Sequence, residues 1–196
     1  MQKIEYWLKP KKQIFRDFKK HVLDKGNIKL HRIFIDRQSD ILFVAHLDTV
    51  LPPKFKQQTK NRIYATGLDD RFGCMIAYNL SEQLGADLLL TDHEESFATT
   101  AKYHDCKEYN WIAEFDRAGD DVVTYQLDNP EFRQALKEYW TLSFGTFSDI
   151  SQLYTEACCM NVGIGYEKAH SEDSYVYLKT MRKQVGKFVE FFEQHK

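Results

Sequence analysis

Hydrophobic and polar residues follow one another along the chain in patterns that predict strands and helices in turn. Residues 41–45 form a continuous apolar run, which is typical of a strand covered on both faces. Residues 28–36 alternate in polarity and predict another strand, and the polar residues 37–40 predict a turn that joins the two strands as a hairpin. Over residues 70–84 apolar side chains recur every four positions and predict a helix packed on a core: Phe72, Ile76, Leu80 and Leu84.

The rest of the chain continues this alternation. A C-terminal helix has an apolar face made of Val185, Phe188, Val189 and Phe192. Strands that alternate with helices predict an α/β fold, a three-layer α/β/α sandwich with a mixed, mostly parallel sheet, whose ligands bind beyond the carboxyl ends of the strands. The other helices are predicted over residues 13–25, 97–106, 130–140 and 148–154, and the other strands over residues 86–92, 111–116, 121–126 and 158–165.

Length and composition narrow the class of protein. A chain of 196 residues suits one well-cored domain, which we expect to span residues 1–196. The net charge of −2 gives no reason to expect a nucleic-acid partner, and the basic residues between positions 9 and 20 are interpreted as a solvated helix face. No apolar run suggests a signal peptide or a membrane span, so we expect a cytoplasmic protein. The cysteines lack metal or redox spacing and are expected to be small core residues: Cys74, Cys106, Cys158 and Cys159.

Residues of the types that bind metals collect where the predicted strands end. The carboxyl ends of parallel strands share one edge of a sheet, so these residues can converge although they are far apart in the sequence. Two imidazoles and several carboxylates suit zinc and exceed what one catalytic zinc takes, which predicts two ions that share a carboxylate. A lone histidine at a strand end is more often a hydrogen-bonded surface or core residue, and an acidic pair is usually loop polarity, so the prediction depends on the whole set. The set is His46, Asp48, Asp69, Glu94, Glu95, Asp116 and His170.

The order of these motifs, HLD, GLDDRFG, HEE, FDRAG and AHSED, resembles that of the di-zinc exopeptidases, a clan of aminopeptidases and carboxypeptidases. The resemblance covers residues 41–177. It implies that a water shared by two metal ions attacks an amide carbonyl. It also implies a role for each residue: His46 and Asp116 hold one metal, Glu95 and His170 hold the other, Asp69 bridges them, Glu94 is the general base, and Asp48 accepts the second ring N–H of His46.

The same resemblance implies finer features. The peptide bond between Asp69 and Asp70 is expected to be cis, and Arg71 is expected to be a structural partner of nearby carboxylates. The segments from His46 to Asp69 and from Asp116 to His170 are too short for the lid or dimerisation domain that many clan members insert there. A lidless single domain favours the aminopeptidase branch over the carboxypeptidases.

The predicted function is therefore a metal-dependent peptidase, an aminopeptidase, with two zinc ions that cobalt or manganese could replace. Its substrate would be a peptide or a small amide. One alternative is a zinc-dependent deacylase acting on a modified small molecule, and another is a binding protein on a peptidase scaffold, which the presence of Glu94 disfavours. The sequence does not choose among Asp149, Glu167 and Glu172 for binding a substrate ammonium group, and it leaves the oligomeric state open.

Overall fold

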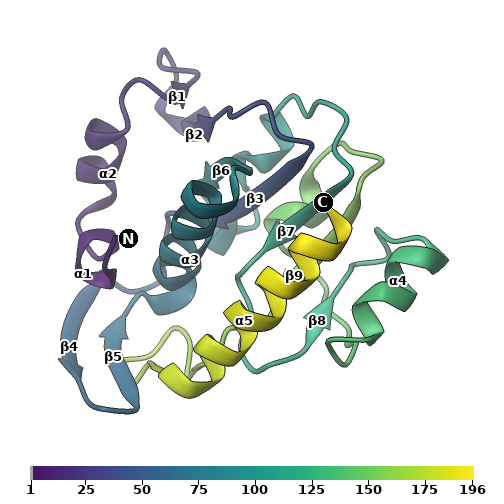
Figure 1. Cartoon of the computed structure of the whole chain (residues 1–196). Coiled ribbons are helices and arrows are strands. Elements are labelled where there is room, and N and C mark those ends of the chain that lie inside the picture. Colours follow the sequence, from purple (N-terminus) through teal and green to yellow (C-terminus); the bar gives the residue numbers. More distant parts are fainter. Residues whose placement is uncertain (1) are drawn as a thin grey trace.

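The computed structural model describes residues 2–196 and has a seven-stranded sheet at its centre (Figure 1). The four middle strands, β6, β3, β7 and β9, are parallel, and the strands outside them run antiparallel to their neighbours. This is the mixed, mostly parallel sheet that the sequence predicts. In spatial order the strands are β1 (Val22–Leu23), β2 (Arg32–Ile35), β6 (Asp87–Thr91), β3 (Ile41–His46), β7 (Trp111–Glu114), β9 (Cys158–Val162) and β8 (Val122–Val123).

The apolar run of β3 lies in the middle of this sheet, between β6 and β7. Its side chains alternate between the two faces, and every residue of the strand is buried. Phe43 packs on one face against the rings of Phe115 and Phe188, whereas Leu42 and Val44 belong to a separate cluster on the other face. Full burial of a phenylalanine side chain contributes about 1.5–3 kcal/mol to the free energy of unfolding. The strand that ends on His46 is therefore firmly held.

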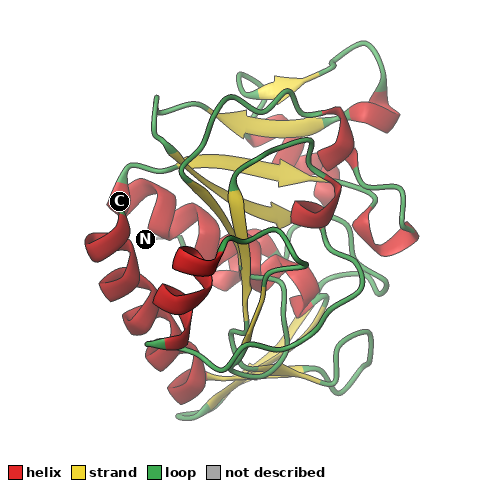
Figure 2. Cartoon of the chain, turned by 90° about the vertical axis from the view of Figure 1, so that its right-hand side faces the viewer, coloured by secondary structure: helices red, strands yellow, loops and turns green. Residues whose placement is uncertain are grey.

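The two faces of the sheet are covered differently. The long helices α3 (Leu68–Leu84) and α5 (Leu178–His195) pack on one face with α1 (Ile4–Trp7), α2 (Lys11–Asp17) and α4 (Pro130–Lys137). The other face carries the short 3-10 helices η3 (Thr100–Tyr103) and η4 (Asp149–Gln152), which contribute Ala101 and Ile150 to the second apolar cluster. Figure 2 shows the long helices together on one side of the sheet.

A second sheet lies beside the first and was not predicted. It contains β10 (Tyr166–Glu167), β11 (Tyr175–Tyr177), β5 (Arg62–Thr66) and β4 (Lys54–Gln58), and all its pairings are antiparallel. Its edge strand β4 is exposed along its whole length, so it has no alternation of buried and exposed residues for a sequence pattern to reveal.

The predicted hairpin between residues 28–36 and 41–46 is wrong. β2 pairs with β6 instead, in the register Ile33↔Leu90, and β3 lies on the far side of β6. The connection between β2 and β3 passes the beginning of β6, where the carboxylate of Asp87 accepts the main-chain N–H groups of Arg37 and Ser39 at 2.7 and 3.2 Å. That buried carboxylate anchors the crossing, which turn chemistry alone did not indicate.

Several predicted elements are shorter than expected. The helix predicted over residues 13–25 ends at Asp17, and Val22 pairs with Ile33 in strand β1. The helix predicted over residues 97–106 is only the 3-10 helix η3. β8 stops at Val123 because Tyr125 and Gln126 have left-handed backbone angles, with φ of 53° and 65°, which cannot continue a strand. The 3-10 helices η1 (Ile28–Leu30) and η2 (Glu94–Ser96) complete the elements.

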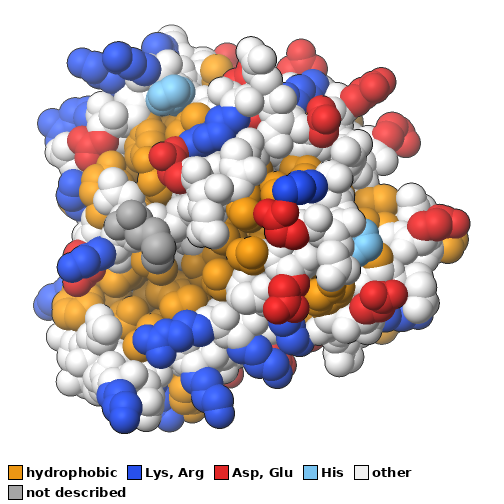
Figure 3. All heavy atoms as spheres, viewed as in Figure 1, with side chains coloured by type: hydrophobic (Ala, Val, Ile, Leu, Met, Phe, Trp, Pro, Cys, Tyr) orange, Lys and Arg blue, Asp and Glu red, His pale blue; other side chains and the backbone are white. Residues whose placement is uncertain are grey.

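The two long predicted helices are confirmed. Phe72, Ile76 and Leu80 of α3 and Phe188 and Phe192 of α5 are buried in the main core. Figure 3 shows hydrophobic side chains among charged ones on this face of the molecule, in the region of α3 and α5. Within residues 2–196, no helix combines the length and apolar character needed to span a bilayer. The four cysteines are free and fully or partly buried, as expected of small core residues.

Candidate metal centre

The carboxyl edge of the central sheet brings the predicted site residues together. His46 is the last residue of β3 and pairs in register with Thr91 at the end of β6. Glu94 and Glu95 begin the turn η2 just beyond β6, and Asp116 follows β7 by two residues. Asp69 lies in the first turn of α3, and His170 lies in the loop between β10 and β11.

The first group of atoms surrounds the imidazole of His46. Its Nε2 atom lies 3.4 Å from Oδ1 of Asp69 and 3.5 Å from Oδ2 of Asp116. This nitrogen is fully buried and makes no hydrogen bond with any described residue. A buried nitrogen that faces two carboxylate oxygens without a hydrogen bond is what a metal ligand presents.

The second group surrounds the imidazole of His170. Its Nε2 atom lies 3.1 Å from Oδ2 of Asp69 and 3.0 Å from Oε2 of Glu95. The two oxygens of Asp69 thus face different histidines, Oδ1 towards His46 and Oδ2 towards His170. This is the arrangement that a carboxylate shared by two cations requires.

The spacings fit ions of the size of zinc. In a tetrahedral site with bonds of 2.0–2.1 Å, two ligand atoms of one ion lie about 3.3 Å apart. The four distances in the two groups run from 3.0 to 3.5 Å. In addition, ligand atoms of His46, Asp69 and Glu95 all lie within 4.8 Å of one another, as do those of His46, Asp70 and Asp116.

The charge of the centre also favours cations. Across residues 2–196, no lysine or arginine forms an ion pair with the carboxylates of Asp48, Asp69, Glu94, Glu95 or Asp116. Burial alone would lower the pKa of His46, but the carboxylates of Asp116, Asp48 and Asp69 raise it well above its usual value. The hydrogen bond to Asp69 and the nearby carboxylates raise the pKa of His170 to about 9. Positive charge is therefore stabilised at both histidines.

Asp48 connects His46 to the loop that carries the two glutamates. Nδ1 of His46 lies 3.1 Å from the main-chain oxygen of Asp48 and 3.4 Å from its carboxylate, so the main-chain oxygen is its closer partner. The Asp48 carboxylate instead accepts the main-chain N–H groups of Glu94 and Glu95, at 3.1 and 3.0 Å. Burial raises the pKa of Asp48, but His46 and these two donors together lower it to about 2.

Glu94 lies beside the first group of atoms and has a perturbed carboxyl group. Its Oε2 atom is 3.7 Å from Nε2 of His46. Burial, reinforced by the carboxylates of Asp116, Asp149 and Asp69, raises the pKa of Glu94 to about 8. A carboxyl group with such a pKa can both take up and release a proton near neutral pH.

Two residues that form hydrogen bonds with Asp116 were not predicted from the sequence. The hydroxyl group of Tyr166 donates to Oδ1 of Asp116 at 3.1 Å, which leaves Oδ2 facing His46. The side-chain amide of Asn161 accepts the main-chain N–H of Asp116 at 3.1 Å and donates to its main-chain oxygen at 2.9 Å. Asn161 had one sequence signal, since it is a polar residue within the apolar stretch of β9.

The DDR motif has the expected peptide geometry but different partners. The bond between Asp69 and Asp70 is cis. Asp70 is buried, and its carboxylate accepts the main-chain N–H of His46 at 3.1 Å. Arg71 was expected to pair with carboxylates, but its buried guanidinium donates to the main-chain oxygens of Trp7 and Lys9, at 2.7 and 3.2 Å. Arg71 therefore joins the N-terminal segment to α3.

Two of the three carboxylates considered for binding a substrate ammonium are bonded within the chain. Asp149 is buried and accepts the hydroxyl groups of Thr91 and Thr99. Glu172 pairs with Lys56 at 2.7 Å on the surface. Glu167, on β10, is half-buried and makes no ion pair with any described residue. Of the three, Glu167 alone has no ion-pair partner within residues 2–196.

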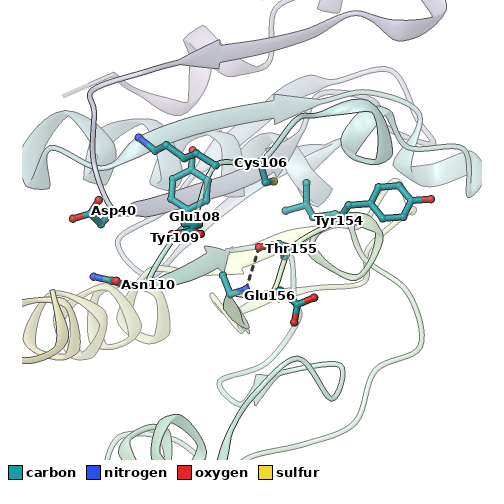
Figure 4. A pocket seen from close by; sticks show the side chains of 11 residues that line it. Asp40, Cys106, Glu108, Tyr109, Asn110, Tyr154, Thr155 and Glu156 are labelled. Carbon is teal, nitrogen blue, oxygen red and sulfur yellow. Dashed lines mark hydrogen bonds between the residues drawn. The ribbon is translucent and has the colours of Figure 1, made fainter.

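A hollow lies at the opposite edge of the sheet. It has a volume of about 940 Å³ and is lined by residues that directly precede β3, β7 and β9, namely Asp40, Asn110 and Ala157. Figure 4 shows the side chains around it. Because the ligands of parallel sheets bind at the carboxyl ends of the strands, and the histidine and carboxylate cluster is there, this hollow is not the candidate active site.

Comparisons with solved structures place the fold among peptidases. The aminopeptidase PepT from Bacillus cereus is similar over 93% of this chain and 91% of its own, with a TM-score of 0.56 and 12% identity. The TET1 peptidase of Pyrococcus horikoshii, which can assemble into a tetrahedron or a large octahedral shell, is similar over 90% of this chain and 91% of its own, with a TM-score of 0.61 and 13% identity. An endoglucanase from Thermotoga maritima is similar over the whole of both chains, with a TM-score of 0.59 and 9% identity.

The chain therefore has the fold that the PepT aminopeptidase and the TET1 peptidase share. No protein-family model matches the sequence, and no curated protein matches it. Identities this low show the fold alone.

Proposed function

We propose that this chain is a metal-dependent aminopeptidase that uses two zinc ions and Glu94 as its general base. The observation that carries the proposal is the geometry around Asp69. Its two carboxylate oxygens face His46 and His170 at 3.4 and 3.1 Å, and each histidine faces one further carboxylate at a similar distance. The fold of the PepT and TET aminopeptidases supports the same class of reaction.

The residues present fit two cations. His46, Asp69 and Asp116 would hold the first, and His170, Asp69 and Glu95 would hold the second. Bound zinc ions would supply a water of lowered pKa and polarise the carbonyl group of the substrate. The chain itself orients the ligands: Tyr166 and Asn161 fix Asp116, and Asp48 fixes the main chain of Glu95.

Glu94 would move the proton. Its carboxyl group is not needed as a ligand in either set, and Oε2 lies 3.7 Å from the His46 nitrogen that faces the first group. In the proposed reaction Oε2 takes a proton from the attacking water and returns it to the departing amine.

A free amino terminus is the proposed substrate feature. In the chain, residues between His46 and Asp69 form β4 and the antiparallel β5, and those between Asp116 and His170 form β8, α4, η4, β9 and β10. We expect these short segments to lack a separate lid of the type that carboxypeptidases use for the substrate carboxylate. This arrangement supports the aminopeptidase branch of the class.

A mixed peptide pool tests the proposal. The purified protein is loaded with zinc, cobalt or manganese and given peptides of which half have free and half have acetylated amino termini, and the products are followed by mass spectrometry with and without a chelator. Chelator-sensitive, stepwise loss of residues from free amino termini is the expected result. Selective removal of acetyl groups would replace the proposal with a deacylase, and metal binding without turnover would replace it with a binding protein.

A further inference from the structure

An exposed aromatic residue lies one turn from the proposed base. Phe97 ends the 3-10 turn that begins at Glu94, and its main-chain N–H donates to the Glu94 oxygen at 2.8 Å. Its side chain is 77% exposed. A phenylalanine exposed to that extent forgoes the burial that normally stabilises such a side chain.

The backbone of Phe97 is also unusual. Its φ of 57° and ψ of 24° are left-handed, a conformation that is rare for a bulky residue because the Cβ atom meets the backbone. A second main-chain hydrogen bond holds the same turn, because the N–H of Ala98 donates to the His93 oxygen at 3.0 Å. Strain of this kind collects at functional sites, where the surrounding structure imposes it.

A second aromatic ring comes from another loop to meet Phe97. The ring of Phe147 lies edge-to-face with it, with centroids 5.0 Å apart. Phe147 directly precedes Ser148 and Asp149, and Asp149 accepts the hydroxyl groups of Thr91 and Thr99, which flank the glutamate loop. The two rings are therefore carried by loops that Asp149 joins through hydrogen bonds.

We propose that Phe97 and Phe147 form the apolar wall of a subsite that binds a hydrophobic side chain of the substrate, on a residue next to the amide bond that is cut. This inference rests on the proposed function and specifies its substrate class: peptides with an aliphatic or aromatic residue at that position. Apolar subsites beside a small number of polar catalytic groups are typical of enzyme pockets. A side chain of the substrate would cover the exposed face of Phe97 and recover the burial that the free protein lacks.

Two series of tripeptides test the subsite. One series varies the first residue (X-Ala-Ala) and the other varies the second (Ala-X-Ala), with X being leucine, phenylalanine, serine, aspartate or lysine. The wild-type protein is expected to show a higher kcat/KM for apolar X in one of the two series. Phe97→Ala should reduce that preference by about tenfold or more, because an apolar contact of this size discriminates by such factors.

Matched variants make the test specific. Phe97→Leu keeps an apolar side chain and should retain most of the preference. Phe144→Ala removes another phenylalanine of the Phe147 loop, 97% exposed, that makes no ring contact with a described residue, and should leave the preference unchanged. Zinc stoichiometry and circular dichroism of each variant show whether the fold and the metal centre are intact.

The two proposals fail in different ways. If the wild type cleaves peptides and Phe97→Ala keeps the full apolar preference, the subsite is wrong and the aminopeptidase stands. If the wild type cleaves nothing, the aminopeptidase is wrong, and the subsite is then tested by calorimetric binding of Leu-Ala-Ala and Asp-Ala-Ala to the zinc-loaded protein. Equal affinities for these two peptides would overturn the subsite, whereas a preference for Leu-Ala-Ala that Phe97→Ala abolishes would support it.

Discussion

The carboxylate of Asp48 accepts the main-chain N–H of Glu95 at 3.0 Å. This hydrogen bond ties the loop that follows β6 to the end of β3. The other oxygen of the same carboxylate accepts the main-chain N–H of Glu94 at 3.1 Å. One side chain therefore positions a proposed metal ligand and the proposed base together. The aspartate of the HLD motif holds the loop after β6 at least as firmly as it holds the histidine before it.

Asp48→Asn should impair both functions of the glutamate loop. Asparagine offers one carbonyl oxygen to two N–H groups, and its own NH₂ group would face the second N–H. We expect kcat/KM to fall by about 10- to 100-fold and the second zinc ion to bind more weakly, because loss of a group that orients metal ligands costs about this much. Steady-state kinetics and calorimetric zinc titration measure the two effects. Asp36→Asn is the control, since the exposed Asp36 likewise accepts a main-chain N–H, that of Gln38.

Much of this arrangement was predictable, because it depends on strand ends. His46 ends an apolar run, and Asp116 and the glutamate pair follow two others. Once the strands are taken as parallel, their shared carboxyl edge brings these residues together without further information. The distinction between the proposed base, Glu94, and the proposed metal ligands, by contrast, came from the resemblance in motif order. Substitution of Glu94 tests this distinction.

Glu94→Gln should strongly reduce turnover and keep the metal ions. The glutamine side chain has a similar shape but cannot accept and return a proton, so kcat should fall by about 10²- to 10⁴-fold. Zinc stoichiometry should stay at two per chain, because Glu94 belongs to neither ligand set. Glu108→Gln, at the hollow on the opposite edge of the sheet, is the control and should be fully active. An active Glu94→Gln protein would remove Glu94 from the mechanism.

Tyr166→Phe should weaken the binding of one metal ion selectively. Without the hydroxyl group that donates to Oδ1 of Asp116, the carboxylate is free to rotate away from His46. We expect about a tenfold or greater loss of affinity at the first ion and little change at the ion held by His170 and Glu95. Calorimetric titration with zinc resolves the two steps. Tyr64→Phe, which removes a hydroxyl bonded to Arg62 in the second sheet, should change neither; equal weakening of both steps by Tyr166→Phe would contradict the assignment.

The role of Tyr166 could not be predicted from sequence patterns. Its ring is buried, as expected of a core residue, but the partner of its hydroxyl group depends on how distant segments of the chain pack together. An isolated bridge between Ala118 and Tyr166 brings the closing segment beside the residues that follow β7. Hydrophobic periodicity describes one segment at a time, so it could not reveal this contact, nor the exposed strand β4, nor the crossing of the chain past Asp87.

His104 should make the protein less stable below neutral pH, independently of the metal centre. Its imidazole is buried against the ring of Phe34, with centroids 4.6 Å apart, and neither ring nitrogen has a hydrogen-bond partner in the described chain. Burial, together with the positive charge of Arg32, lowers the pKa of His104 to about 4. The unfolded chain binds this proton near pH 6.5, so the neutral ring contributes its full stability above that pH and loses it as the pH falls towards 4.

Between pH 7 and pH 5 this titration should remove about 2 kcal/mol from the free energy of unfolding. Urea unfolding in the presence of a chelator measures the difference, and the chelator removes metal binding as a source of pH dependence. His104→Phe keeps an aromatic ring in the same apolar surroundings. Between pH 7 and pH 5, its free energy of unfolding should fall by about 2 kcal/mol less than that of the wild type. His21→Phe, at an exposed position, should show the same fall as the wild type. If the His104→Phe protein lost as much stability as the wild type, the neutral buried imidazole would not be the source, because every other titrating group is common to both proteins.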